Sequence, residues 1–297
     1  MSGTTHVGAV GVFSGGLQRR PTAEALELVG EWEQLGYGSL WLSESAGAKN
    51  VLTFAAVVLG ATVEITVASA IAVIWNRDAT AMMNAGRTLA DAFPGRFVLG
   101  MGVAHRDSAA LRGNTYEKPL EAMRSYLEAM NEAPYDGHLP DRPAPRLLAA
   151  LGPRMVALAT EMTDGMHTFL TTPDHTSTVR GIAGEGPLLA VEQGVLLTAD
   201  PEEARTAARD NLQRFIKWPN YRRHLRRIGF DEDDLADGGS DRIVDAIYAI
   251  GDEDAIARRI AEHHAASADN VSLLVVPGGP LDEAETLRRL APAVLSG

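Results

Sequence analysis

The feature that most constrains the fold is a regular alternation of short apolar segments with longer amphipathic ones. The short segments have the length and composition of buried strands, and the longer ones repeat apolar residues at helical spacing. Such alternation produces parallel strands joined by right-handed crossovers. The expected strands span residues 6–13, 39–42, 65–73, 97–101, 147–151, 166–170, 188–197 and 271–277. The expected helices span residues 22–35, 51–60, 80–92, 119–130, 154–162, 175–182, 201–218 and 253–266, with a short last helix.

Eight strand-helix units are the number that closes a barrel, so an α/β fold, a (β/α)8 TIM barrel, is predicted as one domain over residues 1–297. A doubly wound open sheet is the alternative, and it would need a GxGxxG fingerprint after a strand. The segment RFVLGMGVAHRD has Gly100 and Gly102 but no third glycine. Those two glycines are interpreted as room for a ligand at a strand end, and the alternative is that they serve only barrel packing, Gly102 more so than Gly100. The polar stretch around 219–245, which contains RRHLRR and DEDDLADGG, is predicted to be a helical insertion.

Composition excludes several classes of partner. Acidic residues outnumber basic ones by 39 to 27, giving a formal charge of −12, which argues against nucleic acid and anionic membranes. The absence of cysteine removes disulfides and thiolate sites. No metal is expected, because His263 and His264 are adjacent and point about 100° apart on a helix. A cytoplasmic location is expected from the lack of a signal-like or membrane-spanning segment.

Four stretches carry a family resemblance: ITVASAIAVIWNRDATAMMNAGRTLA, DAFPGRFVLGMGVAHR, LLAALGPRMVALATEMTDGMHTFLTTPDHT and GDEDAIARRIAEHHAASADNVSLLVV. Together they resemble the bacterial luciferase-like oxidoreductases, and within them the actinobacterial branch that uses the deazaflavin coenzyme F420. The resemblance covers nearly the whole chain and is weakest around 219–245. It implies a barrel that holds a deazaflavin or flavin at the carboxyl ends of the strands, and a homodimer.

The resemblance also implies a set of cofactor contacts. A cis peptide bond is expected between Ser69 and Ala70, forming a bulge behind the ring. A helix start is expected to receive phosphate on its free N–H groups. The other implied contacts are Ala72, Val103, Ala104 (glycine in many relatives) and Ser108, and for the phosphate Gly152, Pro153, Met155 and Val156.

Candidate catalytic residues are Glu44 and His105. The resemblance places Glu44 beside the pyrimidine side of the deazaflavin, and a solvated loop carboxylate is the alternative. Ser45 stands where the glucose-6-phosphate dehydrogenases of the family have a catalytic histidine, so that specificity is not implied. His105 would titrate near neutral pH at the active face, although its charged neighbours also fit an exposed loop. His167 is expected either to point into the barrel mouth or to be a core histidine.

The function expected from this resemblance is hydride transfer between a deazaflavin and a small organic substrate. A deazaflavin transfers two electrons as hydride and does not readily activate oxygen, so a reductase or dehydrogenase is predicted. The alternatives are an FMN-dependent monooxygenase of the same family and a barrel that binds a flavin without catalysis. The RRHLRR segment is expected to be a solvated helix face, with coverage of the cofactor's anionic tail as the alternative.

Overall fold

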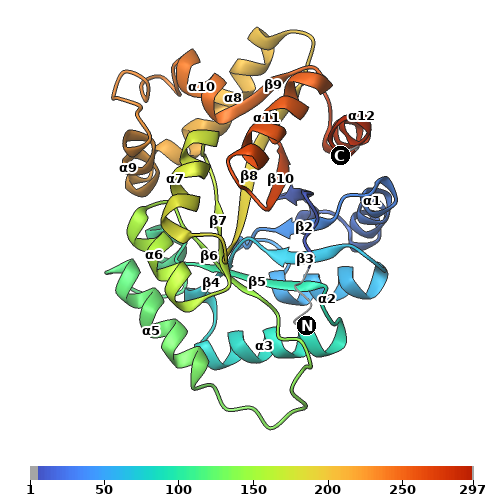
Figure 1. Cartoon of the computed structure of the whole chain (residues 1–297), viewed down its shortest axis with the longest axis vertical. Helices are drawn as coiled ribbons and strands as arrows, with labels where there is room; N and C mark the ends of the chain where they lie inside the picture. The colour runs from blue at the N-terminus through green and yellow to red at the C-terminus, as the bar shows by residue number, and fades with distance from the viewer. Residues whose placement is uncertain (1–5, 296–297) are drawn as a thin grey trace.

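The computed structural model describes residues 6–295, and its central feature is a closed barrel of parallel strands (Figure 1). Strand β1 pairs with β2 on one side and with β10 on the other, and β10 also pairs with β8, which closes the ring. The short strands β3 and β4 follow one another along β5 and together take one place in the ring. The predicted (β/α)8 barrel is therefore confirmed. The barrel strands are β1 (Val10–Ser14), β2 (Ser39–Leu42), β3 (Thr66–Ser69), β4 (Ala72–Val73), β5 (Phe97–Gly102), β6 (Arg146–Ala149), β7 (Gly165–Thr168), β8 (Leu188–Leu197) and β10 (Asn270–Val275).

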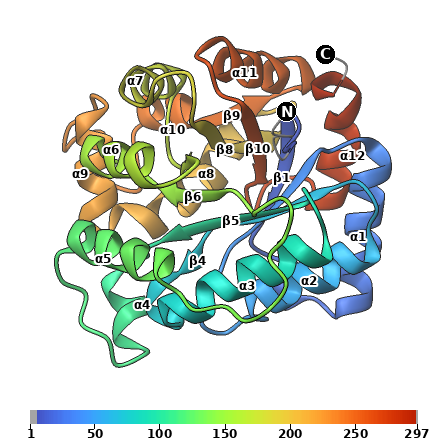
Figure 2. The same ribbon diagram turned by 60° about the horizontal axis from the view of Figure 1, so that its bottom comes forward.

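Helices surround the barrel (Figure 2). Most begin at a side chain that accepts a hydrogen bond from the first turn, as Asn50 does for Leu52 and Thr53, or at a proline in the first turn. No helix within residues 6–295 is long and apolar enough to cross a membrane. The helices are α1 (Thr22–Leu35), α2 (Val51–Ala61), α3 (Ala79–Ala92), α4 (Arg106–Ala110), α5 (Pro119–Asn131), α6 (Pro153–Met162), α7 (Pro173–Ala183), α8 (Pro201–Ile216), α9 (Pro219–Arg227), α10 (Asp241–Ile247), α11 (Glu253–Ala265) and α12 (Glu283–Val294).

The barrel has apolar layers on both faces of its strands. The larger layer lies between the strands and the surrounding helices. A smaller apolar cluster fills the inside of the barrel. Its members come from different strands and include Phe13, Trp41, Val98, Leu147 and Ala190. Because side chains alternate between the two faces of a strand, residues two positions from these also face the inside. The inside is therefore a packed core, as expected for a barrel of this size.

The segment between β8 and α11 forms a structure of its own at one end of the barrel (Figure 1). It contains α8, α9, α10 and strand β9 (Tyr248–Gly251), and a second apolar cluster lies beneath it, with Leu212, Leu225 and Val244 fully buried. Strand β9 pairs with Gly194–Leu197, the outer half of β8, whereas β7 pairs with the inner half. This excursion, residues 200–252, is thus hydrogen-bonded into the barrel at its end.

Candidate active site

The carboxyl ends of the parallel strands meet at one mouth of the barrel, and the loops after β2, β4, β5, β6 and β7 converge there. Barrel enzymes build their active sites from these loops. The residues predicted for the site lie at this mouth or in the first turns of the helices that follow. They are Glu44 after β2, Ser69, Ala70 and Ala72 along β3 and β4, Val103, Ala104, His105 and Ser108 after β5, and Gly152, Pro153, Met155 and Val156 after β6.

Between β3 and β4 the strand path is interrupted by a cis peptide bond that joins Ala70 to Ile71. The sequence placed this bond between Ser69 and Ala70, so that prediction was wrong by one residue. The N–H of Ala70 still donates to the carbonyl oxygen of Leu42 at 2.7 Å. The ladder with β2 therefore includes Ala70, and the chain leaves the ladder only after it.

Gly100 and Gly102 make room for this interruption. A Cβ atom on Gly100 would lie 2.0 Å from the carbonyl oxygen of Ser69, and one on Gly102 would lie 2.1 Å from Cδ1 of Ile71. This geometry fits the alternative, in which the glycines serve barrel packing, and room for a ligand stays a prediction. Their missing side chains let β3 and the Ile71 side chain pack against β5.

Glu44 is buried and paired. One carboxylate oxygen accepts from the backbone N–H of Val73 at 2.7 Å, and the carboxylate forms an ion pair with Arg77. The side chains of Glu44 and Arg77 are only 5% and 11% exposed. Glu44 is thus not a solvated loop carboxylate, and it ties the end of β2 to the segment after β4. Contact with a cofactor ring stays a prediction.

Ser45, next along the chain, brings no titratable group to the mouth. Its hydroxyl accepts from the guanidinium of Arg19 at 3.1 Å. The side chain at this position is therefore a hydroxyl bonded to Arg19 and not an imidazole.

The turn after β5 is fixed by two aromatic side chains. The indole N–H of Trp75 donates to the carbonyl of Val103 at 2.8 Å, and the hydroxyl of Tyr116 donates to the carbonyl of Ala104 at 3.3 Å. Ala104 has φ of +47°, in the left-handed region that favours glycine. Ala104 therefore holds a backbone conformation for which glycine is better suited.

His105, the next residue, packs against an aromatic ring of the excursion. Its imidazole stacks on Trp218 with ring centroids 3.9 Å apart, and its Nδ1 is buried without a hydrogen-bond partner among the described residues. Burial lowers the pKa of His105 to about 4, so the ring is neutral at pH 7. It is not part of an exposed loop. Ser108, in the short helix α4, is partly buried.

The Trp218 stack belongs to an aromatic cluster that covers the β5 to β7 side of the mouth. Phe169 follows β7 and makes edge contacts with Phe215 of α8 and Tyr221 of α9. Tyr221 also contacts His105 and Trp218 at centroid distances of 5.4 and 6.1 Å. The excursion thus supplies three of the five rings over the mouth.

The start of α6 offers fewer free N–H groups than the sequence implied. Pro153 has none, and those of Met155 and Val156 both donate to the carbonyl of Gly152. Gly152 and Arg154 supply the remaining N–H groups of this helix start. Two amides alone make a weak phosphate site, so a further cation is needed.

Helix α9 supplies that cation. Arg227 donates to the carbonyl of Leu151 at 3.3 Å, and its Nη1 would lie 3.1 Å from a Cβ atom on Gly152. The ring nitrogens of His224 lie 3.0 and 2.9 Å from the carbonyl oxygens of Leu151 and Leu170. Burial lowers the pKa of His224 to about 4, while both carbonyls favour the protonated ring. The RRHLRR segment is therefore partly buried on the ends of β6 and β7.

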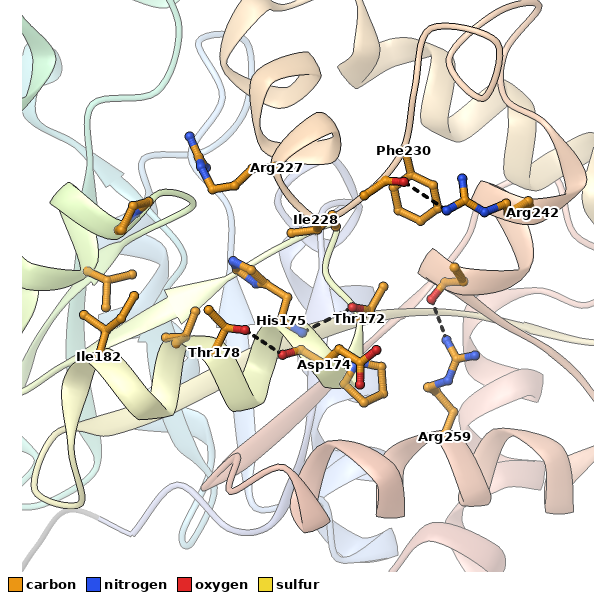
Figure 3. A pocket seen from close by; sticks show the side chains of 16 residues that line it. Thr172, Asp174, His175, Thr178, Ile182, Arg227, Ile228, Phe230, Arg242 and Arg259 are labelled. Carbon is orange, nitrogen blue, oxygen red and sulfur yellow. Dashed lines mark hydrogen bonds between the residues drawn. The ribbon is translucent and has the colours of Figure 1, made fainter.

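A groove of about 690 Å³ extends from this corner between α7 and the excursion (Figure 3). Three arginines line it. Arg242 pairs with Asp234, and Arg259 pairs with Glu262. Arg227 has no carboxylate partner in the part of the chain that the structure describes. Of the three, it is the guanidinium best placed to bind an anion.

His167 lies inside the barrel. Its ring stacks on Trp41 with centroids 5.1 Å apart, and its Nε2 is sealed without a hydrogen-bond partner among residues 6–295. Burial lowers the pKa of His167 to about 4. His167 is therefore a neutral core histidine, and one of its nitrogens is not satisfied.

Glu192 is a candidate that the sequence reading missed. It lies on β8 two positions after Ala190 and so faces the inside of the barrel, whereas Gln193 faces outward and bonds His263 of α11. Burial raises the pKa of Glu192 well above its usual value. A signal was available, because an acid interrupts the otherwise apolar strand LLAVEQGVLL.

No group of three or more histidine, aspartate or glutamate side chains that could hold a metal occurs among the described residues. His263 bonds Thr176 and Gln193, whereas His264 bonds the carbonyl of Ala268. The two adjacent imidazoles therefore bond to groups on different sides of α11.

These residues fit a cofactor that combines a flat ring with a phosphate. Gly152, Arg154 and Arg227 provide two amides and a cation at one corner of the mouth. The sealed Nδ1 of His105 and the unpartnered carboxyl of Glu192 are polar groups beside the same opening. Ile71, Val103 and Ala104, after β3 and β5, are apolar and partly exposed.

Comparison with known proteins gives matches over most of the chain. The luciferase-like monooxygenase family matches residues 4–270. A 5,10-methylenetetrahydromethanopterin reductase from Archaeoglobus fulgidus is 23% identical over 287 residues, covering 88% of this chain and 84% of the relative.

Two solved structures show the same fold. The coenzyme F420-dependent tetrahydromethanopterin reductase from Methanopyrus kandleri has a TM-score of 0.78 and 17% identity, covering 98% of this chain and 99% of that one. The oxygenating constituent of 3,6-diketocamphane monooxygenase from Pseudomonas putida, in complex with FMN, has a TM-score of 0.69 and 16% identity, covering 96% and 98%.

Proposed function

Because the chain belongs to the luciferase-like monooxygenase family, we propose that it is an oxidoreductase that uses coenzyme F420 for hydride transfer with a small organic substrate. When bound, the cofactor supplies or accepts the hydride, and the protein orients its ring and shapes the pocket. The observation that carries the proposal is the corner formed by Gly152, Arg154 and Arg227. An unpaired guanidinium beside two free amides at a helix start suits the phosphate of such a cofactor.

The choice of the deazaflavin over FMN rests on two further observations. The Methanopyrus F420 enzyme superimposes with the higher TM-score of the two structures compared above. The stretches around β3, β4 and β5 resemble the F420 branch, in which Glu44 matches an acidic position beside the ring. FMN also carries a phosphate, so an FMN-dependent monooxygenase is the second candidate.

The assignment is tested by titrating the protein with F420, FMN and a deazaflavin that lacks the phosphate, with tryptophan fluorescence as the readout. Trp41, Trp75 and Trp218 lie at or below the mouth, so a bound ring will quench them. We expect F420 to bind at least about tenfold more tightly than FMN. Micromolar binding of FMN without binding of F420 would replace the proposal with the monooxygenase, and binding of neither would refute both.

The variant Arg227→Ala tests the phosphate corner. We expect it to weaken F420 binding by about tenfold, near the lower end for a charged hydrogen bond because the side chain is exposed. Binding of the deazaflavin without phosphate is expected to be unchanged. Arg226→Ala is the matched control, because Arg226 on the same helix pairs with Glu232. Equal losses of affinity for F420 and for the deazaflavin without phosphate would show that the phosphate does not bind at Arg227.

A further inference from the structure

The inside of the barrel holds one acid whose position the fold does not explain. Glu192 faces the inside from β8 and is only 6% exposed. Its carboxyl forms no hydrogen bond with any described residue. Burying a carboxyl group without a partner is unfavourable, and an apolar side chain would fill the same space at lower cost. Such groups are found more often at functional sites than elsewhere.

The carboxyl of Glu192 also differs from the unpartnered imidazole nitrogen of His167 inside the barrel. Nε2 of His167 is sealed from solvent, whereas the carboxyl oxygens of Glu192 are not among the sealed polar atoms. The carboxyl of Glu192 therefore keeps a contact with solvent that Nε2 of His167 lacks. This accessibility makes Glu192 the better candidate for chemistry.

The groups around Glu192 favour its neutral form. The electrostatic neighbours of its carboxyl are the phenols of Tyr221 and Tyr248, from α9 and β9. The Tyr248 hydroxyl donates to Asn211 at 2.9 Å, so its proton is directed away from Glu192. Of the guanidinium groups on the other side of the mouth, Arg77 is paired with Glu44 and Arg19 bonds Ser45. Burial without a cation beside it raises the pKa of Glu192 well above its usual value.

We propose that Glu192 is the catalytic acid of this site and that the substrate is a neutral carbonyl compound, an inference that rests on the proposed function. A neutral acid can donate a proton to a carbonyl oxygen but gives no counter-charge for a cationic substrate. The inside of the barrel beside it is apolar, with Ala190 two positions before it on β8, and this disfavours an anionic substrate as well. A small, largely apolar ketone or aldehyde meets these conditions.

The proposed step balances. A hydride from the reduced deazaflavin bonds to the carbonyl carbon, which oxidises the cofactor by two electrons. The electron pair of the carbonyl π bond takes the proton of Glu192, and the product is an alcohol. The carboxylate that remains regains a proton from solvent at the mouth. In the reverse direction the same carboxylate accepts the alcohol proton.

The first test uses the cofactor-free protein. Infrared spectra at pH 7 should contain the C=O stretch of a protonated carboxylic acid, and this band should be absent from Glu192→Gln. Glu128→Gln, an exposed acid on α5, is the matched control and should leave the band unchanged. If wild type and Glu192→Gln have the same spectrum in this region, the proposal is overturned, whatever the cofactor.

The second test measures single-turnover oxidation of reduced F420 by acetone, 2-butanone and cyclohexanone. We expect Glu192→Gln to lower the rate by about 10²- to 10⁴-fold, the usual contribution of a general acid, with an unchanged Kd for F420. Glu192→Asp should recover part of the rate. A rate for Glu192→Gln close to that of wild type would overturn the catalytic role.

The failures of the two proposals are distinguishable. A wild-type protein that binds F420 but reduces none of the three ketones would overturn the carbonyl assignment and leave the cofactor proposal intact. A wild-type protein that does not bind F420 would overturn the proposed function, and this inference with it. Urea unfolding of each variant shows whether a lost rate reflects a lost fold.

Discussion

The two halves of the barrel mouth are built in different ways. In the half formed by β1 to β5, the polar groups pair with one another, as Glu44 does with Val73 and Arg77. In the half formed by β6 to β8, the excursion covers the strand ends and brings His224 and Arg227 onto them. Polar groups without partners occur in both halves, Oε1 of Gln18 after β1 and Nδ1 of His105 after β5 in the first, and the carboxyl of Glu192 on β8 in the second. The barrel repeat thus supplies the scaffold of both halves, and the excursion covers only the second.

The largest expected effect comes from the contact that attaches the excursion to the second half. His224→Ala removes a fully buried ring and leaves two carbonyl groups without their contacts. We expect a loss of about 2–4 kcal/mol in the free energy of unfolding, measured by urea denaturation. His138→Ala, at an exposed site, is the control. A loss below about 1 kcal/mol would mean that α9 is held mainly by its apolar contacts.

In the first half, Glu44→Ala tests whether a paired carboxylate also contacts the cofactor. If Glu44 accepts a ring N–H, the variant should weaken F420 binding by about 1.5–3 kcal/mol, or about 10- to 150-fold, in the fluorescence titration. Arg77→Ala keeps the carboxylate but removes its ion pair. Equal losses in both variants would show that Glu44 acts through the shape of the mouth, and an unchanged Kd in Glu44→Ala would remove its role.

The smallest effect concerns His167, inside the barrel between the two halves. Burial lowers its pKa from 6.5 to about 4, so the unfolded chain binds more protons between those pH values. Stability contributed by the neutral ring is therefore complete above pH 6.5 and is lost as the pH falls toward 4. At pH 5 the loss is about 2 kcal/mol from this residue.

His167→Phe keeps the stack on Trp41 and removes the titration. Its free energy of unfolding should fall less steeply than that of wild type between pH 7 and pH 5, in urea denaturation at each pH. Parallel curves for the two proteins would contradict the assignment of this acid sensitivity to His167.

The scaffold was predictable from sequence because it depends on local periodicity. The eight strands follow from short apolar runs, and Gly36 ends α1 in the left-handed conformation that a helix end favours. The placement of the site residues at the mouth follows from strict alternation, because all parallel strands end at the same face.

What could not be predicted depends on contacts between distant segments. The cis bond falls after Ala70 because Leu42 of another strand still holds that residue in the ladder. Gly100 and Gly102 serve a packing contact with β3 and Ile71 that no local pattern reveals. His224 meets Leu151 across 73 residues of sequence. Glu192 alone left a local signal, an acid within an apolar strand.

The pairing of β8 with β9 limits how the mouth can open. Strand β7 pairs with β8 as far as Val191, and β9 pairs with β8 from Gly194 to Leu197. Four residues of β8 and four of β9 are in register. A rigid swing of the whole excursion would break this ladder and expose its backbone groups. The ladder therefore fixes the returning end of the excursion to the barrel, and the backbone groups of β9 stay paired only in this position.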